Sequence, residues 1–257
     1  MSGTLTYVYC VVAGATTPRL ARAPRGLPEM ARPRALAVAA GMYLIVADAP
    51  SARYGGSAIE AGLRDLDWVS RCAVAHEAVV EHMARVGLTV VPTKMFTLFA
   101  DDARALAHVT RLRRKIEGLL RRIAGRQEWG LRVVLDERRA LARPAGRGNG
   151  APTSGTAFLV QRKAEKDAAH RLVAEARTEA DRLFDHLSRH ADDARRRRPN
   201  ADAPARLLLE AAFLVPVGRG RAFRAETARR ARALAPQGYD LSLSGPWPPY
   251  SFVTEAT

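Results

Sequence analysis

A proline-rich segment near the C-terminal end constrains the fold more than any other stretch of the chain. Residues 239–243 alternate apolar and polar side chains, which predicts a β-strand leading into this segment. Gly245 then permits a turn, and the prolines that follow fix φ and remove backbone donors, so the segment is neither a helix nor a central strand. Two interpretations stay open, a clasp over the core and a docking segment for a partner. The prolines and the aromatic residues that they hold in place are Pro246, Trp247, Pro248, Pro249, Tyr250 and Phe252.

The amino-acid composition is that of an ordinary globular protein, but the net charge is unusually high. The 257 residues are enough for one large or two medium domains, and 47% of them are hydrophobic. The formal net charge is +15, yet only four of the 41 basic residues are lysines, a bias that suggests GC-rich coding more than selection for one site. We therefore interpret the charge as mostly solvated surface. Binding of nucleic acid is kept as the alternative function.

Cysteine use and hydropathy indicate the compartment. Cys10 and Cys72 both lie in apolar runs, which predicts reduced, buried thiols. The first residues do not resemble a signal peptide, and no apolar run reaches the roughly 18 to 20 residues of a membrane span. We expect a cytoplasmic protein without a membrane partner.

The first half of the chain alternates strand and helix patterns. A Pro/Arg-rich loop over residues 15–33 is too polar for a core element. Runs of β-branched and aromatic residues predict strands at 4–12, 35–47 (a hairpin around Gly41), 88–91 and 128–135. Apolar residues at every third or fourth position predict two amphipathic helices, 69–83 and 101–123. This succession predicts an α+β domain of the ferredoxin-like type, with one extra or rearranged strand, over residues 1–142.

The second half is predicted to be a smaller α+β domain. Residues 143–155 contain four glycines and two prolines, which predicts a flexible linker. The domain over 156–257 then begins with a long helix, to about residue 190. An arginine run at 195–198 predicts a solvated loop. A strand at 207–217, a helix at 221–234 and a strand at 239–243 follow, and the proline-rich segment closes the domain.

No set of residues has the spacing of an active site. His76 and Glu77 with His82 lack the second histidine of the zinc-protease helix motif, because that position is Val80. His76 lies on the apolar stripe of its helix, which favours a satisfied core histidine. We therefore expect no catalytic, cofactor or metal site.

Two further patterns have a structural and a functional interpretation. His186 and His190 are four residues apart and could share a metal, but no third ligand can be named, so a solvated helix face is favoured. Seven basic residues flank the helix predicted at 101–123 without aromatic neighbours that would stack on bases, so a solvated face is favoured over a nucleic-acid partner.

Ordered short motifs along nearly the whole chain resemble one family. Residues 245–252 (GPWPPYSF) are similar to the C-terminal signature of the gas vesicle protein F/L family. Further pieces occur in the expected order: YVY at 7–9, AVAHE at 73–77, VPTKMFTLF at 91–99, EWGLRV at 128–133, SGTAFL at 154–159 and FLVP at 213–216. Each piece alone is short, but the ordered set is specific.

The resemblance implies a non-enzymatic accessory protein for assembling gas vesicles, the structures that give cells buoyancy. It implies binding to the small, very apolar major shell protein, and to other accessory gas vesicle proteins, in the cytoplasm and in association with the vesicle. An exposed sheet edge of the N-terminal domain is the binding surface that we expect. The motif residues, structural or partner-binding, are Tyr7, Tyr9, His76, Glu77, Pro92, Phe96, Phe99, Glu128, Trp129, Gly130, Gly155, Pro216, Gly245, Pro246, Trp247, Pro248, Pro249, Tyr250 and Phe252.

Overall fold

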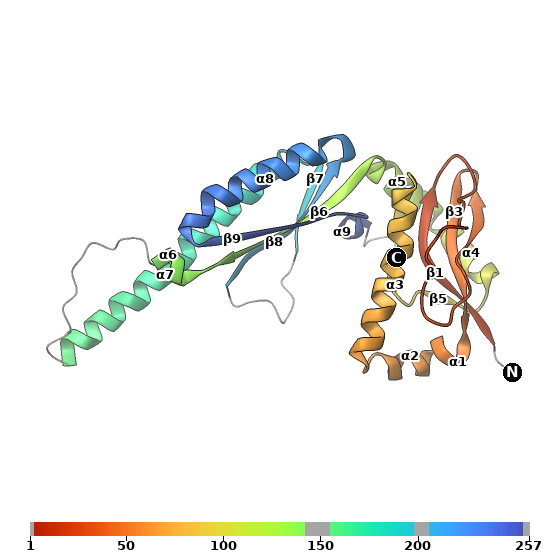
Figure 1. Cartoon of the computed structure of the whole chain (residues 1–257), viewed down its shortest axis with the longest axis horizontal. Helices are drawn as coiled ribbons and strands as arrows, with labels where there is room; N and C mark the ends of the chain where they lie inside the picture. Colours follow the sequence, from red (N-terminus) through yellow and green to blue (C-terminus); the bar gives the residue numbers. More distant parts are fainter. Residues whose placement is uncertain (1–2, 142–154, 198–205, 254–257) are drawn as a thin grey trace. The chain divides into compact units, whose positions relative to one another are not determined.

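The chain folds into two compact units (Figure 1). The structure, a computed structural model, describes residues 3–141, 155–197 and 206–253. Unit 1 comprises residues 1–127 and 247–257, and unit 2 comprises residues 128–246. This division differs from the predicted domains 1–142 and 156–257, because the strand at 126–135 pairs within the sheet of unit 2 and the C-terminal segment returns to unit 1. The predicted linker at 143–155 lies outside the described residues except for Gly155.

Unit 1 is built on a sheet in the order β2-β3-β1-β4, with β5 also paired to β1. Strand β1 is antiparallel to β3, β4 and β5, and its central residues are buried. The register of β1 against β3 shifts at Tyr9, between Val8 and Cys10. The strands are β1 (Thr4–Ala13), β2 (Arg34–Ala39), β3 (Met42–Pro50), β4 (Thr89–Pro92) and β5 (Leu98–Phe99).

The helices of unit 1 follow the predicted apolar stripes, with one interruption. Helix α3 begins where the Asp65 carboxylate accepts the Trp68 N–H (3.0 Å). It buries most of the predicted stripe as far as Met83, but Ala73 of that stripe is exposed. The helix predicted at 101–123 is divided into α4 and α5 at Leu112, whose N–H is shared between the carbonyls of His108 and Val109. The helices are α1 (Ser51–Tyr54), α2 (Gly56–Gly62), α3 (Leu66–Arg85), α4 (Asp102–Arg111), α5 (Arg113–Ile123) and α9 (Tyr250–Val253).

The loop between β1 and β2 contributes to the core of unit 1, although its composition predicted a purely polar segment. Leu27 is buried, and its N–H donates to the hydroxyl of Tyr9 (3.1 Å). The hydroxyl of Tyr54 donates to the Pro28 carbonyl (2.7 Å). These buried hydrogen bonds fix the loop without a helix or a strand. Both cysteines, Cys10 and Cys72, are free and buried, as predicted.

Unit 2 has the β-α-β-β-α-β succession of ferredoxin-like folds, with the sheet order β7-β8-β6-β9. The sequence predicted this type for the first half. Unit 1 has the same strand order, but the described residues between β1 and β2 form a loop in place of a helix. The elements are β6 (Arg126–Leu135), α6 (Glu137–Leu141), α7 (Gly155–Ser188), β7 (Asp193–Arg196), β8 (Leu207–Pro216), η1 (Val217–Arg219), α8 (Gly220–Leu234), η2 (Ala235–Gln237) and β9 (Tyr239–Trp247).

Helices α7 and α8 lie side by side against the sheet of unit 2 (Figure 1). Their buried residues, including Leu183, Leu187 and Phe223, pack with Phe213 of β8 and Val133 of β6 in one core cluster. None of the helices in the described ranges is both long and apolar enough to cross a bilayer. The predicted α+β class is confirmed.

Strand β7 occupies the arginine run that predicted a solvated loop. It pairs antiparallel with β8, from Asp193 opposite Leu214 to Arg196 opposite Ala211. The Arg196 guanidinium lies over the Phe184 ring (4.4 Å to the centroid) and donates to Asp181 (2.7 Å). Charged side chains are tolerated here because β7 is an edge strand.

Candidate functional site

A cluster of buried rings lies at the centre of unit 1. The Tyr7 hydroxyl and His76 Nδ1 are 2.7 Å apart in a hydrogen bond, and the imidazole stacks on Tyr9 with ring centroids 5.5 Å apart. Tyr7 and Tyr9 contact each other edge to face, at 4.8 Å. Side chains of residues 7 and 9 point to the same face of β1, and the apolar stripe of α3 brings His76 onto that face.

The hydrogen bonds of Tyr7 determine the tautomer of His76. The Tyr7 hydroxyl accepts the N–H of Phe96 (3.4 Å) and has one proton to donate. Burial lowers the pKa of His76 to about 4, against a small opposing effect of the Thr93 backbone, so the imidazole is neutral at pH 7. When Tyr7 donates to Nδ1, all three groups are satisfied and the imidazole proton is on Nε2. That Nε2–H is buried and meets no acceptor with full hydrogen-bond geometry among the described residues, although the Thr93 backbone interacts with the imidazole.

The segment from Pro92 to Thr97 is held tightly against β1. The Thr93 hydroxyl lies within hydrogen-bond distance of two β1 carbonyls, at 2.8 and 2.9 Å, and the Thr97 hydroxyl donates to the Lys94 carbonyl (2.7 Å). Phe96 has a φ of 64°, a conformation that is strained for a bulky residue. Its ring stacks on Trp68, with 5.3 Å between centroids and 5° between planes. These contacts stabilise the strained turn.

Three segments that are distant in the sequence line one open cavity of about 310 Å³ in unit 1. Helix α3, the segment after β4 and helix α9 each form part of its wall. We call it the motif cavity, and its lining residues are Ala73, His76, Glu77, Pro92, Thr93, Lys94, Met95, Tyr250 and Val253.

Polar groups of the motif cavity are few and differ in charge. The buried hydroxyl of Tyr250 lies near the Glu77 carboxylate, although the two groups do not reach full hydrogen-bond geometry. Burial raises the pKa of Tyr250, and interaction with the nearby Glu77 carboxylate raises it further. Lys94 is exposed and adds a positive charge. The cavity therefore offers apolar walls, a buried N–H donor, a buried hydroxyl and one charge of each sign.

The proline-rich segment closes the motif cavity from the C-terminal side. Pro248, Pro249, Phe252 and Val253 are buried, and α9 contacts β4 within unit 1. The Phe252 carbonyl accepts a hydrogen bond from Arg122 of α5 (3.3 Å). These contacts agree with the clasp interpretation for this part of the segment. In contrast, 41% of Trp247 is exposed.

The predicted motif residues are divided between unit 1 and unit 2. Phe99 lies apart from the motif cavity, in β5 beside His108 (5.2 Å between ring centroids). The other motif residues of unit 1 are Tyr7, Tyr9, His76, Glu77, Pro92, Phe96, Trp247, Pro248, Pro249, Tyr250 and Phe252. Those of unit 2 are Glu128, Trp129, Gly130, Gly155, Pro216, Gly245 and Pro246.

Motif residues of unit 2 have packing roles in the structure. The buried carboxylate of Glu128 pairs with Arg197, and Trp129 packs against Phe223 (6.2 Å between centroids). A Cβ at Gly130 would lie 2.7 Å from the Ser244 hydroxyl, so glycine lets β6 and β9 approach closely.

Sequence reasoning missed five residues of the cavity wall: Ala73, Thr93, Lys94, Met95 and Val253. The first four lie inside the motifs AVAHE and VPTKMFTLF, so taking every residue of these motifs as a candidate would have found them. The interpretation of His76 as a satisfied core histidine fits Nδ1, which is bonded to Tyr7, whereas Nε2 has the Thr93 backbone nearby but no hydrogen bond of full geometry among the described residues.

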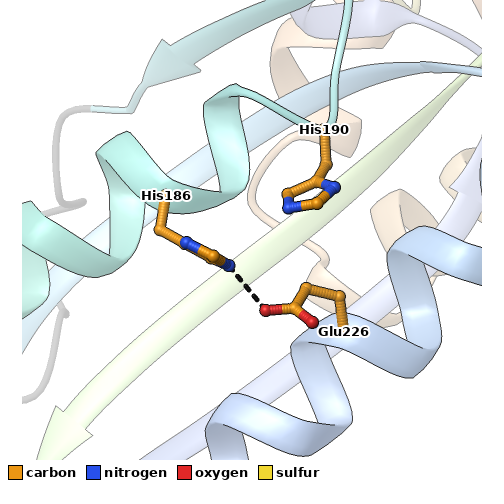
Figure 2. A group of neighbouring side chains, drawn as sticks. All are labelled: His186, His190 and Glu226. Atoms are coloured by element: carbon orange, nitrogen blue, oxygen red, sulfur yellow. Dashed lines mark hydrogen bonds and ion pairs between the residues drawn. The ribbon is translucent and has the colours of Figure 1, made fainter.

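The other histidine pair has a neighbour that the sequence did not reveal. Glu226 of α8 lies beside His186, with 2.5 Å between its Oε1 and the His186 Nε2 (Figure 2). The sequence predicted that His186 and His190 lie on a solvated helix face. His190 is exposed, but His186 is partly buried and paired with Glu226.

Comparisons with known proteins identify the family. The family model described as "Gas vesicle synthesis protein GvpL/GvpF" matches residues 5–254. Gas vesicle protein L of Streptomyces sp. (strain CB03234) is 28% identical over 210 residues, which are 79% of this chain and 76% of that protein.

Two crystal structures show the same fold. GvpF from Anabaena sp. PCC7120 has a TM-score of 0.70 at 16% identity, over 98% of this chain and 96% of that one. GvpF from Microcystis aeruginosa has a TM-score of 0.65 at 15% identity, over 97% and 98% of the two chains. None of these matches supports the nucleic-acid alternative, and they agree with the expectation of a non-enzymatic protein. The chain belongs to the GvpL/GvpF family of gas vesicle synthesis proteins.

Proposed function

We propose that this chain is a non-enzymatic accessory protein of gas vesicle assembly that binds the major shell protein through the motif cavity. It would act as a minor structural component or as an assembly chaperone, associated with gas vesicles in the cytoplasm. The observation that supports this proposal is the convergence of three family motifs, on α3, after β4 and on α9, around one cavity. A purely structural role for these motifs does not by itself account for the buried Nε2–H of His76, which meets no acceptor with full hydrogen-bond geometry among the described residues.

The chemistry of the motif cavity suits one anchoring side chain of a partner. Its volume of 310 Å³ equals that of roughly ten water molecules, which is enough for one or two side chains. Ala73, Met95 and Val253 provide apolar contact, and His76 Nε2–H can donate to a backbone carbonyl of the entering segment. An apolar segment anchored by one hydrogen bond fits this site, as expected for a very apolar shell subunit.

An apolar subunit needs such a partner before it joins the vesicle wall. Exposed apolar surfaces and strand edges aggregate when they are left uncovered. Covering one anchor segment at a time would keep the subunit competent for assembly. Other gas vesicle proteins are further partners in this proposal, and the outer edge of β2 remains a second candidate surface, as expected from the sequence.

The test is co-expression with the major shell protein, followed by purification after nuclease treatment at increasing salt. Ala73→Arg places a long charged side chain at the cavity wall from an exposed helix position. Val74→Arg is the matched control, because Val74 is the next residue of α3, is 68% exposed and does not line the cavity. We expect the shell protein to co-purify at high salt with the wild type and Val74→Arg, and to be lost with Ala73→Arg. All three proteins should melt at similar temperatures.

Equal recovery of the shell protein with both variants would exclude the motif cavity and direct attention to the β2 edge. Recovery of nucleic acid alone, released as salt rises, would instead support the nucleic-acid alternative.

A further inference from the structure

Two histidines at the C-terminal end of α7 face the same direction. His186 lies in the last turn of α7, and His190 follows in a turn in which its N–H donates to the Leu187 carbonyl (2.9 Å). Side chains four residues apart share a helix face, and these two rings have centroids 5.2 Å apart. The end of α7 therefore presents two imidazoles together.

Helix α8 brings a carboxylate to the same place. Phe223 is buried in the core of unit 2, and the buried Thr227 donates to its carbonyl (2.9 Å), which fixes this turn of α8. Glu226 consequently faces α7, and Figure 2 shows its carboxylate directed at the two imidazoles. One potential ligand atom from each residue lies within 4.8 Å of the others. The side chains of His186 and Glu226 are only 21% and 13% exposed.

We propose that His186, His190 and Glu226 form a binding site for a divalent transition-metal cation, with Zn²⁺ as the best match. Two imidazoles, one carboxylate and a water are a common zinc ligand set. Ligand atoms around tetrahedral zinc are roughly 3.3 Å apart. His190 would therefore approach the other two groups by up to about 1.5 Å, whereas His186 and Glu226, which are 2.5 Å apart, would separate by roughly 0.8 Å. Side-chain rotation is enough for this movement, because His190 is exposed and lies beyond the end of α7.

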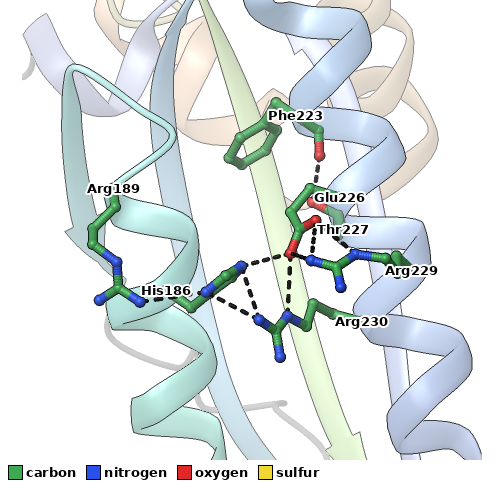
Figure 3. Close-up of polar contacts among 7 residues, drawn as sticks. All are labelled: His186, Arg189, Phe223, Glu226, Thr227, Arg229 and Arg230. Atoms are coloured by element: carbon green, nitrogen blue, oxygen red, sulfur yellow. Dashed lines mark hydrogen bonds and ion pairs between the residues drawn. The ribbon is translucent and has the colours of Figure 1, made fainter.

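Three arginines surround these ligands and set the strength of binding (Figure 3). Arg229 donates to both oxygens of Glu226, at 2.7 to 2.9 Å, and orients the carboxylate. It is also the main reason that the pKa of Glu226 is lowered to about 2, so the carboxylate is ionised at pH 7. Nη2 of Arg230 lies 3.1 and 3.2 Å from the two ring nitrogens of His186. Nη2 of Arg189 lies 3.3 Å from His186 Nδ1.

The cation must therefore displace Arg230 from His186. The nearby positive charges weaken binding of every cation, and imidazole ligands then favour late transition metals over Mg²⁺ and Ca²⁺. A metal bound by α7 and α8 together would link these two helices. Because it would bind the folded unit 2 and not the unfolded chain, it would stabilise that unit by mass action.

The test is isothermal titration calorimetry of the full chain, purified without a histidine tag and treated with a chelator, against ZnCl₂. Absorption of bound Co²⁺ reports whether the coordination is tetrahedral. His190→Asn removes one ligand at an exposed position, and His170→Asn is the matched control, an exposed histidine on the same helix. Arg230→Gln removes the competing guanidinium.

We expect one Zn²⁺ per wild-type chain, with affinity at least about tenfold weaker in His190→Asn and unchanged in His170→Asn. Arg230→Gln should bind about tenfold more tightly, since one like charge near a partly exposed divalent ion is removed. Absence of binding in both the wild type and Arg230→Gln would overturn the proposal. Equal loss in the two histidine variants, or weaker binding by Arg230→Gln, would also overturn it.

Discussion

The buried imidazole of His76 should make unit 1 sensitive to acid. Its pKa is about 4 in the folded chain and 6.5 in the ordinary, solvated state. Above pH 6.5 the group is neutral in both states, and stability is at its full value. Between pH 6.5 and 4 the unfolded chain binds a proton that the folded chain does not, so the free energy of unfolding falls. A difference of 2.5 pKa units corresponds to about 3 kcal/mol, and the loss levels off below pH 4.

Hydrogen exchange of the β1 amides measures this effect in the full chain. Exchange at pH 7, 5.5 and 4, corrected for the intrinsic rates, gives the free energy of opening for unit 1. His76→Gln cannot titrate, so its free energy of opening should lose about 3 kcal/mol less than that of the wild type over this range. Carboxylates such as Asp102 titrate in both proteins and cancel in the comparison. His82→Gln, from the same helix, should retain the wild-type pH dependence.

The same pH dependence in the wild type and His76→Gln would refute the neutral, buried imidazole. The assignment of the proton to Nε2 would then lose its basis, and the motif cavity would lose its buried donor.

Three substitutions test the packing of the two units by equilibrium unfolding. Tyr7→Phe removes the hydroxyl that satisfies a buried imidazole nitrogen and should cost about 1–3 kcal/mol, with no loss expected if that hydrogen bond is absent. Gly238→Ala puts a Cβ 2.7 Å from a backbone oxygen at a φ of 89°, so it should cost at least about 1 kcal/mol more than Gly87→Ala, where φ is 87° and space is open. Phe223→Ala should cost about 3–5 kcal/mol, because its side chain is 1% exposed beside Phe213, and a cost below 1 kcal/mol would contradict this core assignment.

Local periodicity predicted most of the helices and strands but not their long-range pairing. The stripe of α3 from Val69 to Met83 is visible in the sequence because it depends on residues three and four apart. The pairing of β6 with β8 and β9 depends on residues 70 or more positions away, so the predicted domain boundary did not coincide with the two units. Strand β7 was missed because Arg196 is stabilised by a ring and a carboxylate of α7 rather than by burial.

The long-range contacts that form the candidate sites were likewise not predictable from local sequence patterns. The family motifs include residues of α3, of the segment after β4 and of α9, but the position of these three segments around one cavity is a property of the folded chain. Likewise, the spacing of His186 and His190 predicted a shared face, whereas Glu226 is 40 residues away from His186 and meets it only through helix packing.

The two-part construction of unit 1 also affects when the proposed partner site comes into existence during synthesis. The wall formed by Tyr250 and Val253 is translated 126 residues after Gln127, where the first part of the unit ends. At about 5–20 residues per second this delay is roughly 6 to 25 s. All of unit 2 is translated within this interval and has time to fold first. A nascent chain therefore cannot display a complete motif cavity before α9 has been translated, and engagement of an aggregation-prone partner is postponed until then.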